Sequence, residues 1–134
     1  MPTLEQERAG FALAKAQDLG EHADKYNKLV QGFPATILTD GLGQAVATLM
    51  AKAGKERHRG KLLEHLDEWL CRKNATSPYF RQTRLIDAIV GGSQQDYVLA
   101  QAEALNLLVW LKKFASAYAP GDSGQTGQGR DGDD

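Results

Sequence analysis

Several features that support catalysis, metal binding or membrane insertion are missing from this sequence. The single cysteine, Cys71, excludes an internal disulfide and is typical of a reducing cytoplasm. The three histidines include no pair with the i, i+4 spacing of a helical metal site. No apolar run approaches the roughly eighteen residues that span a membrane. The first ten residues also lack the basic-then-apolar order of a signal peptide.

Glycine-rich phosphate loops and the G-x-S-x-G nucleophile motif are absent as well. We therefore expect a cytoplasmic protein with no catalytic residue, metal, cofactor or small-molecule substrate. Two alternatives stay open. His58 and His65 would form a metal-ligand set with Cys71 if their helix began early, or His65 would act with nearby carboxylates in acid–base chemistry. Solvated histidines beside a buried thiol are the simpler interpretation, so a small enzyme is the weakest hypothesis.

Helical periodicity dominates the sequence, and strand-type alternation of useful length does not occur. Capping patterns at Thr3 and Ser93 open the first and last helices. We expect the first helix to be long, with a bend at Gly20 and a terminator at Gly32. The expected helices lie at residues 4–31, 34–39, 42–53, 61–73, 84–90 and 94–118. The sequence thus predicts an all-α fold, a compact single-domain bundle of five to six helices.

The stretch Pro34–Leu49 is the one around which we expect the bundle to be organised. From Leu42 onward, bulky apolar side chains recur at helical spacing, and small residues form a neighbouring face at Gly43, Ala47 and Ala51. A row of small residues lets another helix approach closely, which predicts a central position for this helix. Asp40 is its expected N-cap, and Gln44 lies on its polar face.

The last fifteen residues have a different composition. Residues 120–134 contain five glycines and no large apolar residue, and their four aspartates against one arginine give a local charge of −3. Such a segment buries too little surface to offset the entropy of ordering. We therefore expect residues 1–119 to form the helical domain and residues 120–134 to be a disordered tail.

Charge is unevenly distributed, although the net charge of the chain is −1. Residues 52–84 hold nine Lys and Arg against four Asp and Glu, a local charge of +5. Cations that converge on phosphates release counterions, so this segment is a candidate nucleic-acid surface, with a merely solvated loop as the alternative. Tyr79 and Phe80 either stack on a base or are buried in the bundle. The candidate RNA-binding residues are Lys52, Lys55, Arg57, Arg59, Lys61, Arg81 and Arg84.

Trp110 is the second unusual residue, because it lies on the only polar line of the last helix, between Asn106 and Lys113. An exposed tryptophan marks a contact site more often than leucine or valine does. A packed tryptophan is the alternative. With the motif residue Arg8 included, the candidate partner contacts are Arg8, Gln44, Trp110 and Lys113.

Four motifs occur in an order that resembles a known family. They are EQ-x-RA-x-x-A at Glu5–Ala12, ILT-x-GLGQA at Ile37–Ala45, EHL-x-x-WL at Glu64–Leu70, and EAL-x-x-L-x-WLKKFA at Glu103–Ala115. Over about residues 4–118 the chain resembles the small helical subunit of the type III-B CRISPR effector, the Cmr ribonucleoprotein complex. Asp40 departs from the family pattern, which has Asn there, and is a poorer phosphate contact for that reason.

The resemblance implies a non-catalytic scaffold subunit in antiviral defence. In that family several copies stack into a filament beside the subunits that hold the guide RNA, and together they form the groove where guide RNA and target RNA pair. The expected partners are therefore other effector subunits, further copies of this chain, guide RNA and target RNA. The rival hypothesis is an autonomous helical nucleic-acid-binding regulator, which would bind duplex DNA without other subunits.

Overall fold

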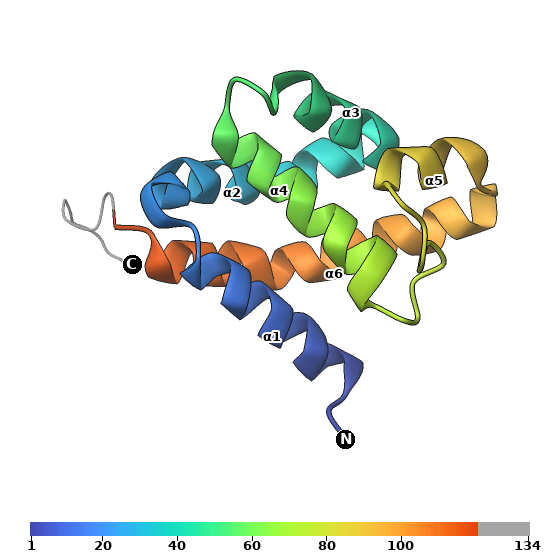
Figure 1. Cartoon of the computed structure of the whole chain (residues 1–134), viewed down its shortest axis with the longest axis horizontal. Helices are drawn as coiled ribbons and strands as arrows, with labels where there is room; N and C mark the ends of the chain where they lie inside the picture. Colours follow the sequence, from blue (N-terminus) through green and yellow to red (C-terminus); the bar gives the residue numbers. More distant parts are fainter. Residues whose placement is uncertain (121–134) are drawn as a thin grey trace.

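The computed structural model describes residues 1–120, and its regular structure there is helical (Figure 1). A 3₁₀ turn at Gly20–His22 joins the first two α-helices, and a π-helical segment, Trp69–Lys73, extends the fourth. The α-helices are α1 (Leu4–Gln17), α2 (Ala23–Asp40), α3 (Leu42–Lys52), α4 (Arg57–Glu68), α5 (Leu85–Gly91) and α6 (Gln94–Tyr118). The predicted all-α bundle is confirmed for this part of the chain, and the predicted tail lies beyond it, apart from Pro120.

The helix at the centre of the bundle is α6, and the prediction that α3 is central is wrong. α6 packs extensively against α1 and α2, and it buries six side chains along its length. In Figure 1, α3 lies at the edge of the bundle, across α4 from α1. Leu42, Val46 and Leu49 are buried as expected, but Ala47 and Ala51 on the small face are exposed. Of the row of small residues, only Gly43 lies against neighbouring helices, beside Ile89 and Tyr97, and Ala47 and Ala51 face away from the core.

The first predicted helix is two helices. The chain breaks at Gly20, whose positive φ of 58° ends any continuous helix, and then α2 continues through Gly32 and Pro34 to Asp40. Proline in a helix interior removes a hydrogen bond, so this continuation needs a compensating gain. Val30, Phe33 and Ile37 supply it because all three are buried on one face of α2.

Two helix ends were predicted correctly from capping patterns. Thr3 and Gln6 form a reciprocal capping box at the start of α1, and the Ser93 hydroxyl accepts the Asp96 amide at the start of α6. The start of α4 was predicted four residues late, at Lys61 instead of Arg57. The predicted left-handed cap at Asn74 is also wrong, because its φ is −89°, whereas Arg81 has a φ of 75°.

The junction between α2 and α3 depends on α6. Asp40 was predicted to cap α3, but it is the last residue of α2, and Gly41 forms the junction with φ 89° and ψ 157°. The first amides of α3 are satisfied from α6 instead. The Leu42 amide donates to Gln101 Oε1 at 2.9 Å, and the Gly43 amide donates to the Tyr97 hydroxyl at 3.0 Å.

Gly41→Ala should destabilise the protein by about 2 kcal/mol. Its backbone conformation is one that essentially only glycine adopts. A Cβ there would also lie 2.9 Å from the Tyr97 hydroxyl that accepts the Gly43 amide. Gly43→Ala is the matched control, since its Cβ would meet Ile89 at an ordinary 3.4 Å, and it should keep or increase stability. Urea unfolding of both variants tests this, and equal midpoints would contradict it.

Within the described residues, no helix is both long enough and apolar enough to cross a membrane.

Candidate RNA- and partner-binding surfaces

The predicted basic residues form two groups rather than one. Lys52, Lys55, Arg57, Arg59 and Lys61 surround the start of α4, and we call them the α4-start cations. Arg81 and Arg84, the loop cations, lie in the connection to α5. Arg72, in the π-helical segment that extends α4, donates to the Thr83 carbonyl at 3.1 Å, and the Leu85 amide donates to Asp67 Oδ1 near the end of α4 at 2.9 Å. The two groups therefore mark opposite ends of the α4 helix.

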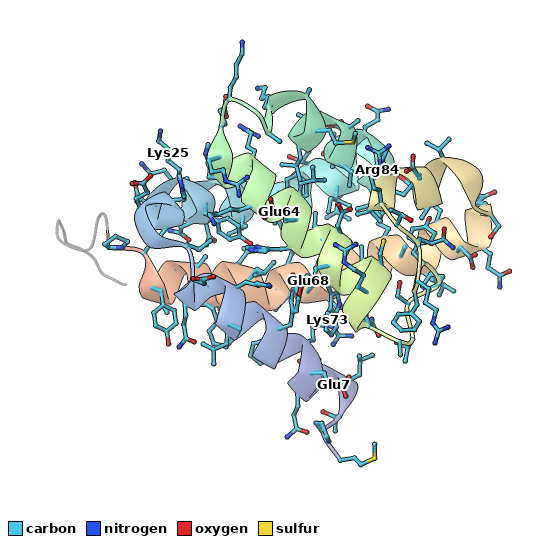
Figure 2. The ribbon with its side chains drawn as sticks, in the orientation of Figure 1. Glu7, Lys25, Glu64, Glu68, Lys73 and Arg84 are labelled. Carbon is cyan, nitrogen blue, oxygen red and sulfur yellow. The ribbon has the colours of Figure 1, made fainter. Side chains whose placement is uncertain are left out.

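Two lysines that sequence reasoning missed extend the α4-start cations. Lys25 and Lys28 of α2 line a pocket of about 270 Å³ together with Leu29, His58 and Arg59. In Figure 2, Lys25 lies beside the first turns of α4, and Arg84 lies on the other side of that helix. The i, i+3 spacing of the two lysines indicates an exposed face of α2. The spacing of residues along α2 does not show that α4 packs next to this face.

Most charges in this region have a weak partner or none. Arg59 pairs with Glu56 at 2.6 Å, and Arg57 pairs with Glu64 at 3.4 Å, where both side chains are exposed. Lys25, Lys52, Lys55 and Lys61 make no ion pair with any residue of the range 1–120. Exposed pairs contribute little to stability. These cations are therefore available to an anionic ligand.

His58 reports the local charge of the pocket. Its pKa is lowered from the usual value mainly by burial and then by Arg59, while Glu56 opposes the shift and Lys25 and His22 add to it. The imidazole is therefore uncharged at neutral pH. An anion in the pocket would favour its protonated form, because opposite charge stabilises the cation.

The loop cations are more constrained. Arg84 forms a bidentate pair with Asp87, at 2.9 and 3.1 Å, and Asp87 in turn raises the pKa of Arg84. The Arg81 guanidinium lies 5.6 Å from the centre of the Phe80 ring. Tyr79 is buried, so it cannot stack on a base, whereas Phe80 remains partly exposed.

Arg8, a predicted partner contact, belongs to an internal network. Its guanidinium donates to both carboxylate oxygens of Glu103, at 2.7 and 2.8 Å, and to Glu5 at 2.8 Å. The Trp69 indole donates to the same Glu103 carboxylate at 2.8 Å. The network joins α1, the π-helical segment and α6. Since Arg8 is buried, we leave it out of the contact surface proposed below.

The other three predicted contacts are at least partly exposed. Gln44 is exposed on α3, and Lys113 is exposed on α6. Trp110 is partly buried: its indole donates to Glu5 Oε2 at 3.1 Å, and its ring stacks on Phe114 at a centroid distance of 5.7 Å. Part of the Trp110 side chain therefore makes contacts inside the monomer, and the rest of it is exposed to solvent.

Lys113 lines a groove between α2 and α6 that sequence reasoning did not identify. The volume of this α2/α6 groove is about 720 Å³. The α2 side supplies Gln31, Pro34 and Leu38, and the α6 side supplies Leu105, Val109, Lys112, Lys113 and Ser116. Helical spacing could have grouped the residues of one side, but only the fold brings the two sides together.

The histidine and cysteine alternatives receive no support from the geometry. His65 was predicted to be solvated, but it is buried, and its Nδ1 lies 2.7 Å from the Tyr26 hydroxyl. Burial, assisted by Lys15 and Lys61, lowers the pKa of His65 to about 3. Cys71 is buried too, which raises the pKa of its thiol to about 11. Within residues 1–120, no three His, Cys, Asp or Glu side chains are grouped so that they could hold a metal ion.

The chain is similar to known proteins in both sequence and fold. The model of the CRISPR-associated protein family Cas_Cmr5 matches residues 4–118, which is the range from the first residue of α1 to the last residue of α6. The crystal structure of a CRISPR-associated Cmr5 family protein from Thermus thermophilus is similar, with a TM-score of 0.73. The sequence identity is 24%, and the match covers 88% of this chain and 98% of that chain. This second likeness concerns the fold.

Proposed function

The chain belongs to the CRISPR-associated Cmr5 family and is thereby a subunit of the type III-B effector, and from this we propose that it is a non-catalytic scaffold. In this proposal several copies stack beside the subunits that hold the guide RNA. Together they form the groove in which guide RNA and target RNA pair during antiviral defence in the cytoplasm. Cleavage belongs to other subunits.

The observation that carries the proposal is the division of the charged side chains between interior and surface. In the interior, the titratable side chains of Tyr26 and His65 are hydrogen-bonded to each other, and Arg8 is paired with Glu103. The surface instead presents cations at the start of α4. A protein arranged in this way is suited to binding a polyanion and neighbouring proteins.

We assign the primary RNA contact to the α4-start cations together with Lys25 and Lys28. Within residues 1–120, Lys25, Lys52, Lys55 and Lys61 are unpaired, whereas Lys28 pairs with Asp24 at 3.4 Å. Phosphate contacts release counterions, so the unpaired lysines on adjoining elements add up to a useful affinity. The pocket between α2 and α4 brings together three cations, Lys25, Lys28 and Arg59, from two helices. Arg81 and Arg84 would make secondary contacts farther along the RNA backbone, since their loop is bonded to the last turns of the α4 helix and not to its start.

Neutralising three of these lysines should weaken RNA binding in a salt-dependent manner. In the assembled effector, Lys25→Gln, Lys52→Gln and Lys55→Gln together should lower the slope of log K against log salt by about 2. Each lost contact removes about 0.7–0.9 from that slope. The fold should be spared, because these lysines are exposed and unpaired within residues 1–120. Target-RNA binding measured between about 50 and 200 mM salt gives the slopes.

The matched control makes the same change in net charge at another part of the surface. Gln94→Glu, Gln95→Glu and Asn106→Asp also change the charge by −3, at exposed positions of α6. This control should leave the slope nearly unchanged. Equal slopes in both triple variants would mean that long-range charge, not contact, is involved. An unchanged slope in the lysine variant would place these cations against solvent or protein.

Co-purification tests the scaffold role itself. The native chain should bring down guide RNA and the larger effector subunits, and the isolated chain should not cleave RNA. Recovery of the chain with duplex DNA but no other subunit would favour the autonomous regulator instead.

A further inference from the structure

The α2/α6 groove exposes large apolar side chains on the surface of the described chain. Leu38 is 70% exposed and Val109 is 51% exposed, and both line the groove beside Pro34 and Leu105. Monomeric proteins seldom leave a contiguous apolar surface of this kind uncovered without a binding role. α2 and α6 lie side by side (Figure 1), and both helices contribute buried side chains to the core.

The shape of the groove fits a helix. Its α6 side runs from Leu105 to Ser116, twelve residues with a rise of about 16 Å, which is three helical turns. Leu105, Val109 and Lys112 recur at the i, i+4 and i+7 positions that form one ridge of a helix surface. A second helix packs into the space beside such a ridge.

The charges of the groove define the chemistry of the occupant. Lys112 and Lys113 lie at one end, and neither makes an ion pair with any residue of the range 1–120. The other end is apolar. An occupant that matches both ends carries apolar side chains about four residues apart and a carboxylate beside the two lysines.

Two occupants supplied by this chain itself fit less well. Residues 120–134 are acidic but contain no large apolar side chain, so they cannot cover Leu38 and Val109. A second copy would have to offer an exposed apolar pair with an acidic neighbour. The exposed pair Val98 and Leu99 lines a pocket with the uncharged Gln94 and Gln95, and the nearby carboxylate of Asp96 is not part of that lining.

We propose that the α2/α6 groove docks an amphipathic helix of another subunit of the effector, three turns long and with a carboxylate facing Lys112 and Lys113. This inference rests on the proposed scaffold role, which requires contacts with other subunits. It assigns the contact to a defined surface, with Lys113 at its charged end and Trp110 outside it.

Matched substitutions test the apolar part of the groove in the reconstituted effector. Leu38→Asp should reduce incorporation of the chain at least tenfold, whereas Val90→Asp should stay within twofold of wild type. Val90 is 78% exposed and lies on α5, outside the groove. Both residues are exposed on helices, and circular dichroism of the isolated variants checks that they fold alike. Equal incorporation of both variants, with wild type assembling normally, overturns the docking inference alone. Failure of wild type to assemble with other subunits overturns the scaffold proposal as well.

A photo-crosslinker at Val109 in the assembled effector identifies the occupant. We expect crosslinks to one helical segment of another subunit that contains a carboxylate near its lysine-facing end. Lys112→Glu with Lys113→Glu should lower incorporation, and replacing that carboxylate by lysine should restore it. Crosslinks to a second copy of this chain, to its own residues 120–134 or to RNA overturn the proposal. Absence of rescue by the charge swap does so too.

Discussion

Glu103→Ala is expected to destabilise the fold by about 3–5 kcal/mol, because it breaks a buried ion pair and leaves one charge without its partner. Glu103 is only 11% exposed, and its carboxylate accepts hydrogen bonds from Arg8 and from the Trp69 indole. Truncation would leave the Arg8 guanidinium buried with its main acceptor removed and the indole N–H unsatisfied. Urea unfolding followed by circular dichroism measures the loss.

Two further variants separate the charge pair from its surroundings. Glu5→Ala should cost less than about 1 kcal/mol, because Glu5 is 63% exposed although it also binds Arg8. The double change Arg8→Met and Glu103→Leu should be clearly less harmful than the two single truncations added together, since it removes both charges at once. A Glu103→Ala variant as stable as Glu5→Ala would show that the network contributes nothing measurable.

Acidification from pH 7 to pH 4 is expected to remove about 3 kcal/mol of stability through His65 alone. Burial is the main cause that lowers the pKa of His65 to about 3, whereas an unfolded histidine titrates near 6.5. Between these values the unfolded state binds more protons than the folded state. Stability therefore rises with pH across this window and is lost as pH falls through it. The free energy of unfolding measured at pH 4, 5, 6 and 7 gives the slope.

Substitutions of His65 and Tyr26 show which groups cause this dependence of stability on pH. His65→Gln should be less stable at pH 7 but should lack most of the pH dependence between 4 and 6.5. Tyr26→Phe should keep most of it, because burial shifts the pKa of His65 more than any neighbour does. Carboxylates such as Glu56 and Asp87 also have lowered pKa values. Wild type should therefore lose additional stability at low pH, where these carboxylates become protonated. Identical slopes for wild type and His65→Gln would attribute the whole effect to those carboxylates.

The charged side chains of this protein have different roles in the interior and on the surface. Arg8 is paired and buried inside the bundle, while Lys25 and Lys113 are exposed at different surfaces. Lys25 belongs to the proposed RNA contact, and Lys113 belongs to the proposed docking groove. The net charge of −1 does not indicate the buried pair, the proposed RNA contact or the proposed docking contact.

Local patterns were enough to predict much of the fold. The capping residues Thr3 and Ser93 and the closing helix 94–118 were predicted correctly, because they depend on hydrogen bonds between residues three apart and on apolar spacing within one helix. The same was true of α5, which lies between Arg84 and Gly92. The order of the four motifs also identified the family. These features need no knowledge of which helix lies beside which.

Only the tertiary structure decided the rest. Whether the chain breaks at Gly20 or at Pro34 depends on the burial of Val30, Phe33 and Ile37, not on the local propensity of either residue. The partner of His65 is 39 residues away, and that of Arg8 is 95 residues away. The α4-start pocket and the α2/α6 groove likewise join residues from separate helices. A sequence records the spacing along each helix, but contacts between helices follow from how all of their apolar faces are buried at once.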